Sequence, residues 1–101
     1  MGNIHTSGED YLEAILVLWN KQNGEVRSID VARELNVTKP SVSNAMKILR
    51  EGKFITMDEN GFITLTDDGR YVAEKIYEKH LVLTEWLLSL GVDRKKSEND
   101  A

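Results

Sequence analysis

The chain has 101 residues, a formal net charge of −4 at pH 7 and no cysteine. This length suits one small domain with a single core, and the lack of cysteine excludes a disulfide framework and a thiolate metal site. No apolar run approaches the roughly 20 residues of a membrane helix and no secretory signal opens the chain, so we expect a cytoplasmic protein without a membrane partner.

The first helix is predicted from Ser7 to Gln22, with Ser7 as its N-cap and Asp10 three residues further on. Its predicted buried stripe consists of Leu12, Ile15, Leu16 and Trp19. Asn23-Gly24 ends the helix. The next three residues, Glu25 to Arg27, are predicted to form a short strand that can join a later sheet.

Two short helices joined by a tight turn are predicted between Ser28 and Glu51. Ser28 is expected to cap the first of them, and the pattern breaks at Asn36-Val37. Thr38 is expected to cap the second helix, where Pro40 is tolerated in the first turn. The apolar residues of the two helices are Ile29, Val31, Ala32 and Leu35, then Val42, Ala45, Met46 and Leu49. This arrangement indicates a helix-turn-helix whose second helix, Lys39 to Arg50, reads DNA.

The outward side of that second helix carries small polar and cationic side chains without bulk, which suits a major groove about 12 Å wide. The outward strip consists of Pro40, Ser43, Asn44 and Lys47, flanked by Lys39, Ser41 and Arg50. Arg27 is placed to contact a phosphate, or equally to be a solvated loop residue. From Val26 to Lys53 six cations oppose three anions, a local charge of +3, whereas the remainder carries −7. An acidic chain with such a basic segment can still bind DNA.

A β-hairpin is predicted directly after the helix-turn-helix. Its strands are Phe54–Met57 and Phe62–Leu65, and Asn60-Gly61 is the hairpin signal between them. A helix-turn-helix followed by a hairpin is a winged helix, which favours DNA binding over an ordinary pair of packed helices. A winged helix used to dock another protein is the alternative.

A long helix is predicted from about Asp67 to Leu90, capped by Thr66 and ended by Gly91. Its apolar stripe consists of Val72, Ile76, His80, Leu83, Leu87 and Leu90. At about 36 Å it exceeds what a domain of this size needs for its own core, which indicates a dimer interface or a further domain. The predicted fold is therefore mainly α (α+β): a winged helix-turn-helix domain over 1–66, and a linker and dimerisation helix over 67–101.

One set of side chains could bind a metal ion. Asp10 and Glu13 are three residues apart on the first helix, and His80 is the histidine of the long helix. Together they could supply half of an octahedral site. On the residues alone, the simpler interpretations are two carboxylates that complement a helix dipole and a packed histidine. No nucleophile elbow, phosphate-binding glycine loop or recognisable carboxylate pair indicates an enzyme.

Several segments together resemble the diphtheria toxin repressor and manganese transport regulator family of metal-dependent regulators. They are Gly8–Ile15, Asp30–Val37, Pro40–Ser43, Leu65–Arg70, Lys79-His80 and Leu90–Val92. The opening Glu-Asp-Tyr-Leu-Glu together with the later Lys-His is the most specific part, and the resemblance covers nearly the whole chain.

The resemblance implies that Asp10, Glu13 and His80 are metal ligands. A carboxylate at Glu13 favours Mn(II), with Fe(II) as the second candidate. The remaining ligands are expected beyond Ala101, so the chain is expected to be an N-terminal fragment with an incomplete site. The implied function is metal-dependent repression of metal-uptake genes by a homodimer that binds a double-stranded operator with two-fold symmetry. Four positions resemble those that contact bases and phosphates in this family, namely Thr38, Pro40, Ser43 and Asn44. We add Lys39 and Lys47 as candidate DNA contacts because of their positive charge.

Two departures from the family pattern affect these expectations. Thr84 stands where the family commonly has a glutamate, which weakens the case for an accessory metal site near His80. Asp58-Glu59 makes the wing tip acidic, so we expect weak wing contacts with phosphate. The alternatives are a winged-helix regulator that senses no metal, a protein-docking winged helix and, more remotely, a metallohydrolase.

Overall fold

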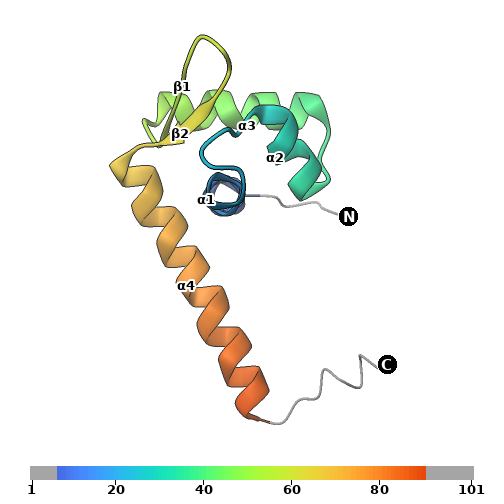
Figure 1. Ribbon diagram of the computed structural model, residues 1–101, viewed down its shortest axis with the longest axis vertical. Helices are drawn as coiled ribbons and strands as arrows, with labels where there is room; N and C mark the ends of the chain where they lie inside the picture. The colour runs from blue at the N-terminus through green and yellow to red at the C-terminus, as the bar shows by residue number, and fades with distance from the viewer. Residues whose placement is uncertain (1–6, 91–101) are drawn as a thin grey trace.

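The computed structural model describes residues 7–90 and contains the predicted winged helix-turn-helix with a long C-terminal helix (Figure 1). Its elements are, in order, α1 (Gly8–Lys21), α2 (Ser28–Leu35), α3 (Lys39–Glu51), β1 (Ile55–Met57), β2 (Ile63–Leu65) and α4 (Asp67–Ser89). The first three helices and the hairpin gather at one end, and α4 extends away from them over a molecule 47 Å long and at most 27 Å wide. Within the described residues no helix is long and apolar enough to cross a membrane.

Three of the four predicted helix caps are confirmed. The Ser7 hydroxyl accepts a hydrogen bond from Asp10 N at 3.2 Å, and Asp10 Oδ2 accepts one from Ser7 N at 3.2 Å. Thr38 and Thr66 likewise cap α3 and α4. Each cap satisfies backbone N–H groups that a helix leaves without an internal partner.

The predicted cap of α2 was wrong by one residue. Arg27 is the N-cap and Ser28 is the first helical residue. Asp30, the third residue of the helix, accepts a hydrogen bond at its Oδ2 from Arg27 N at 2.9 Å, which gives the backbone N–H of the N-cap residue a partner. Val31 and Ala32 are buried in this helix, whereas Ile29 is 39% exposed rather than part of the core.

The predicted strand at residues 25–27 does not form. In the described part of the chain the sheet has two antiparallel strands, with Ile55 opposite Leu65 and Met57 opposite Ile63. Val26 joins its edge through one hydrogen bond, from Ile63 N to Val26 O at 2.8 Å. The next carbonyl, of Arg27, accepts from Asp30 N at 3.0 Å in the first turn of α2, so the chain turns into a helix before a ladder can continue.

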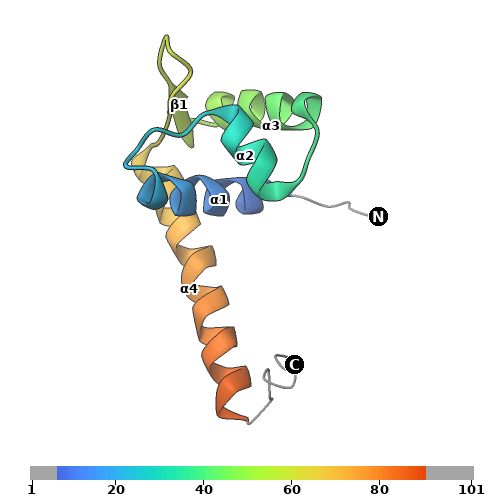
Figure 2. The ribbon, with the colours of Figure 1, turned by 45° about the vertical axis from the view of Figure 1, so that its right-hand side comes forward.

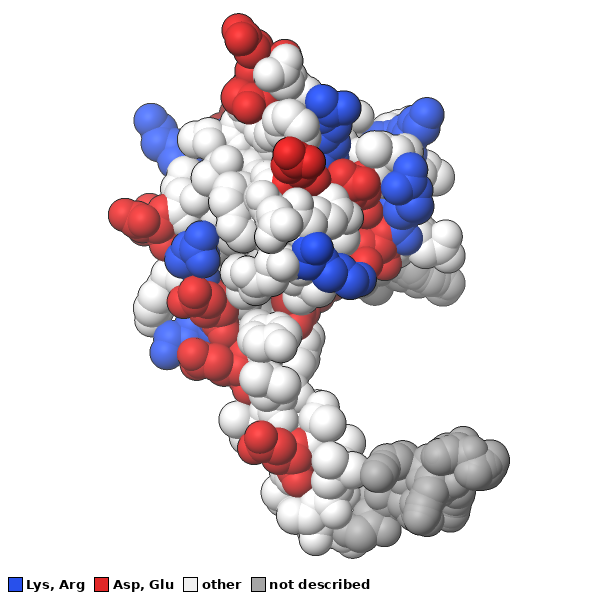
Figure 3. Space-filling view, in the orientation of Figure 1, with Lys and Arg blue, Asp and Glu red and all other residues white. Residues whose placement is uncertain are grey.

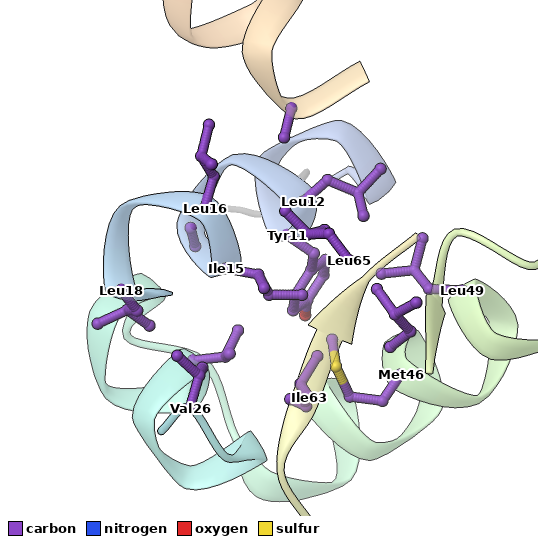
Figure 4. Close-up of a cluster of buried hydrophobic side chains, with 14 of the residues drawn as sticks. Tyr11, Leu12, Ile15, Leu16, Leu18, Val26, Met46, Leu49, Ile63 and Leu65 are labelled. Atoms are coloured by element: carbon purple, nitrogen blue, oxygen red, sulfur yellow. The ribbon is translucent and has the colours of Figure 1, made fainter. Parts of the chain in front are cut away.

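Helix α1 is the centre of the core and is buried on more than one side. Leu12, Ile15 and Leu16 are buried as predicted, and Trp19 is half-buried. Other side chains that sequence periodicity did not select are also buried on this helix, namely Ala14 together with Tyr11 and Leu18, both labelled in Figure 4. The cause is visible in Figure 2, where α1 lies between α4 and the layer formed by α2 and α3. Two packed faces require a wider apolar surface than one stripe.

Helix α4 buries apolar side chains against α1 only in its first half. Gly69 and Ala73 are buried there, while Val72 and Ile76 are half-buried. Beyond this point every side chain from residue 77 to residue 90 is exposed, so the remaining apolar residues of the predicted stripe have no partner among the described residues, and their role in a dimer interface or a further domain stays a prediction. Figures 1 and 2 show that α4 crosses α1 and then runs away from the other helices, which leaves most of its second half without a packing partner in the described part of the chain. Gly91, the predicted end of the helix, lies outside the described residues.

Candidate functional site

Helix α3 presents its predicted reading face to solvent. Val42, Met46 and Leu49 are buried in the core, so the opposite side of the helix points outward. All the residues predicted on this helix or its cap are exposed: Thr38, Lys39, Pro40, Ser41, Ser43, Asn44 and Lys47. The structure therefore leaves all seven residues accessible at and around the outward side of α3.

The start of α3 borders a groove that separates it from the beginning of α1. This α1–α3 groove has a volume of about 900 Å³ and is lined by residues of α1, of the end of α2, of the turn and of α3. Ser41, Asn44 and Ile48 line it from α3. The Thr38 hydroxyl, also on the groove, accepts from Ser41 N at 3.2 Å and donates to Ser41 Oγ at 2.9 Å. The structural role of Thr38 is therefore that of N-cap of α3, the predicted reading helix.

Arg27 makes a contact that sequence reasoning missed. Its guanidinium carbon lies 4.4 Å from the centre of the Phe62 ring, next to β2 of the wing. A guanidinium stacked on an aromatic face keeps its N–H groups at the edge, where they can still meet an acceptor. Arg27 is therefore attached to the wing, and its phosphate contact remains a prediction. The available signal was Phe62 itself, an aromatic residue directly after the hairpin turn.

The tip of the wing is acidic, as Figure 3 shows at the end of the hairpin. Asp58 Oδ1 accepts hydrogen bonds from Asn60 N and Phe62 N, each at 2.9 Å, and Gly61 has a φ of +84°. Asp58 therefore shapes the turn, while Glu59 is exposed beside it. Since both carboxylates repel phosphate, weak wing contacts with DNA remain the expectation.

Two of the three predicted metal ligands meet across 67 positions of the sequence. Glu13 Oε2 of α1 lies 2.8 Å from His80 Nδ1 of α4, with side-chain exposures of 19% and 56%. Carboxylate oxygen and imidazole nitrogen are both donors that Mn(II), Fe(II) and Zn(II) accept. The structure thus places one candidate donor from each helix at the same point.

Asp10 does not join this pair. Its Oδ2 atom accepts the hydrogen bond from Ser7 N that closes the cap of α1. Over residues 7–90 no three histidine, cysteine or acidic side chains are close enough to hold a metal ion. The pair fits a divalent cation as two donors, but the described residues do not complete a site. Thr84 donates to His80 O at 2.9 Å, so its hydroxyl is used within α4.

Comparisons with known proteins agree with this fold. Residues 3–62 match the family model described as iron dependent repressor, N-terminal DNA binding domain. An HTH-type transcriptional regulator of Methanocaldococcus jannaschii is 32% identical over 94 residues, which cover 92% of this chain and 75% of that protein. The transcriptional regulator MntR of Salmonella typhimurium is 34% identical over 95 residues, which cover 92% of this chain and 59% of MntR.

Solved structures of transcriptional regulators share the architecture. ScaR with bound Zn²⁺ aligns with a TM-score of 0.66 and 27% identity, over 84% of this chain and 39% of ScaR. The DNA complex of Staphylococcus aureus MepR aligns with a TM-score of 0.63 and 25% identity, over 85% of this chain and 63% of MepR. The matched part of this chain thus spans less than two thirds of MntR and of ScaR. As predicted, these relatives are transcriptional regulators and not enzymes.

Proposed function

Since this chain belongs to the iron-dependent repressor family of DNA-binding transcriptional regulators, we propose that it is the operator-binding part of a metal-dependent repressor of metal-uptake genes. Its winged helix supplies the DNA-binding surface. The observation that carries the metal dependence is the 2.8 Å contact between Glu13 and His80, because it joins α1 and α4 through two donors of the kind that such a regulator requires.

Helix α3 enters the major groove of the operator in this proposal. Pro40, Ser43 and Asn44 meet base edges, since they are small, exposed and opposite the buried face. Lys39 and Lys47 neutralise phosphates on either side. Thr38 and Ser41, near the start of the helix, contact the sugar-phosphate backbone of the DNA. Arg27 reaches a DNA phosphate from its position over the Phe62 ring.

The proposed metal ligands are Glu13, His80 and Asp10, the last after it gives up its hydrogen bond to Ser7 N. Mn(II) is favoured and Fe(II) is the second candidate, because the donors are carboxylates and an imidazole without a thioether or thiolate. A bound cation would hold α1 and α4 together through the carboxylate of Glu13 and the imidazole of His80. The similarity to MntR and to ScaR, whose structure contains bound Zn²⁺, supports the proposal that this chain responds to a metal ion. We propose that the remaining ligands lie beyond Ala101.

The second half of α4 supports a homodimer. Its exposed large apolar residues, together with the C-cap residue Leu90, are Leu81, Val82, Leu83, Trp86, Leu87 and Leu88. A helix that is apolar on most of its circumference requires a cover in water. We assign residues 67–101 to a linker and dimerisation region in which a second copy supplies part of this cover. Two copies related by a two-fold axis match an operator of the same symmetry in the cytoplasm.

DNA binding is tested by fluorescence anisotropy of the chain on a mixed-sequence duplex across a salt series. The variant Lys39→Glu/Lys47→Glu reverses two charges on α3, and Lys75→Glu/Lys79→Glu is the matched control on α4. Each lost phosphate contact lowers the salt slope by about 0.9. We expect steep salt dependence that the α3 variant loses and the α4 control keeps. Salt-insensitive binding, or equal behaviour of all three proteins, favours the docking module instead.

Metal dependence is tested by titrating Mn(II) into the chain and following free Mn(II) by electron paramagnetic resonance. We expect weak binding, because Glu13 and His80 are two donors of an incomplete site. Glu13→Gln/His80→Ala should abolish it, and Glu85→Gln, on the same helix as His80, should leave it unchanged. Tight stoichiometric binding would contradict the incomplete site. Binding that survives the double substitution would favour a regulator that senses no metal through these residues.

A further inference from the structure

The reading helix carries one exposed large apolar side chain. Ile48 of α3 is 57% exposed, whereas its neighbour Leu49 is 5% exposed and belongs to the core. Among the described residues before α4, the other exposed large apolar side chain is Ile29 of α2, at 39%. Ile48 is thus the exposed large apolar side chain of a helix whose other outward residues are mostly polar or charged, and it borders a groove lined by both polar and apolar side chains.

Ile48 continues a row of residues already assigned to the DNA surface. Ser41, Asn44 and Ile48 follow one another at helical spacings of three and four, and all three line the α1–α3 groove. One helical turn rises 5.4 Å, which is less than two base-pair steps of a duplex. A duplex that touches Ser41 and Asn44 therefore also lies close to Ile48.

The chemistry of the major groove restricts what Ile48 can meet there. Base edges in this groove present hydrogen-bond donors and acceptors, and the one apolar group among them is the 5-methyl group of thymine. An isoleucine side chain offers no hydrogen bond, so against a polar edge it would remove water without replacing its bonds. We propose that Ile48 is a specificity-determining residue that selects thymine through its 5-methyl group. This inference rests on the proposed DNA-binding function.

The experiment removes the methyl group and the isoleucine separately. A preferred duplex is selected from a random pool with the unaltered chain, and each thymine is then replaced by deoxyuridine, which lacks only the 5-methyl group. Binding to this set is measured for the unaltered chain and for Ile48→Ala. Ile29→Ala, at the exposed isoleucine of α2, is the control. Circular dichroism checks that both variants fold, which the exposure of the two side chains leads us to expect.

We expect at least one thymine at which deoxyuridine weakens binding by the unaltered chain and by the Ile29→Ala control about fourfold, the effect of one buried methyl group. Ile48→Ala should be indifferent to deoxyuridine at that same position. Identical deoxyuridine profiles for the unaltered chain and Ile48→Ala would overturn the inference alone. So would an equal loss of affinity for every duplex, which would place Ile48 against deoxyribose. Absence of salt-dependent binding would reject the proposed function and the inference together.

Discussion

Gly69 is the residue at which the smallest substitution should have a large effect on stability. It lies in the first turn of α4, and a Cβ atom there would overlap the carbonyl oxygen of Phe54 and lie 2.9 Å from its carbonyl carbon, against 3.4 Å or more in an ordinary contact. The same oxygen accepts a hydrogen bond from Thr66 N at 3.0 Å. Thr66 Oγ1 in turn donates to Lys53 O at 2.8 Å and accepts from Gly69 N at 3.1 Å. Because the neighbour is backbone, α4 itself must move.

The expected cost of Gly69→Ala follows from these contacts. Overpacking of a close contact costs about 1–3 kcal/mol, and each strained or lost hydrogen bond costs about 0.5–1.5 kcal/mol. Alanine's helix propensity returns about 1 kcal/mol. A net loss of about 2–4 kcal/mol lowers the Tm of a domain of this size by roughly 10–25 °C. Thermal unfolding followed by circular dichroism measures this shift.

A second glycine in the first turn of a helix is the matched control. A Cβ atom at Gly8 of α1 meets only Leu49 Cδ2, at an ordinary 3.8 Å. Gly8→Ala should therefore leave the Tm unchanged or raise it slightly. If Gly69→Ala unfolds within a few degrees of Gly8→Ala, the argument that Phe54 and Gly69 are in backbone contact is refuted.

Other predictions address the wing and the core. Phe62→Leu removes the ring beneath Arg27, and a double-mutant cycle with Arg27→Met should yield a coupling free energy of about 0.5–1 kcal/mol in urea unfolding, whereas zero coupling would contradict the stacked contact. Glu59→Lys reverses a charge at the wing tip and should strengthen DNA binding and steepen its salt dependence; unaltered anisotropy curves would mean that the tip stays away from DNA. Burial raises the pKa of Tyr11 above its usual 10.0, so the folded state holds this proton more tightly than the unfolded state. The associated stability is present below pH 10 and is lost as the pH rises through the raised folded value, and Tyr11→Phe should therefore show a shallower alkaline decline than the unaltered chain.

Local sequence determined the elements and most of their ends. The caps at Ser7, Thr38 and Thr66 form through groups three residues apart, so they can be predicted without knowledge of the rest of the chain. The inward face of α3 likewise follows from its own period, and Asn60-Gly61 indicated the hairpin because few residues tolerate such a turn. These features belong to the neighbouring residues, and they were enough to predict a winged helix and its outward reading surface.

The tertiary structure decided what each surface meets. A helical period defines a face without stating how many partners will cover it, so the burial of Tyr11 and Leu18 on further sides of α1 could not be predicted from one stripe. The same limit explains His80, which belongs to an apolar pattern but is exposed and lies against Glu13, because α4 crosses α1 and then leaves the core (Figure 2). Arg27 looked like a free loop cation until the fold placed Phe62 beneath it. These contacts join residues 35 to 67 positions apart, and their geometry depends on how the helices and the wing pack together.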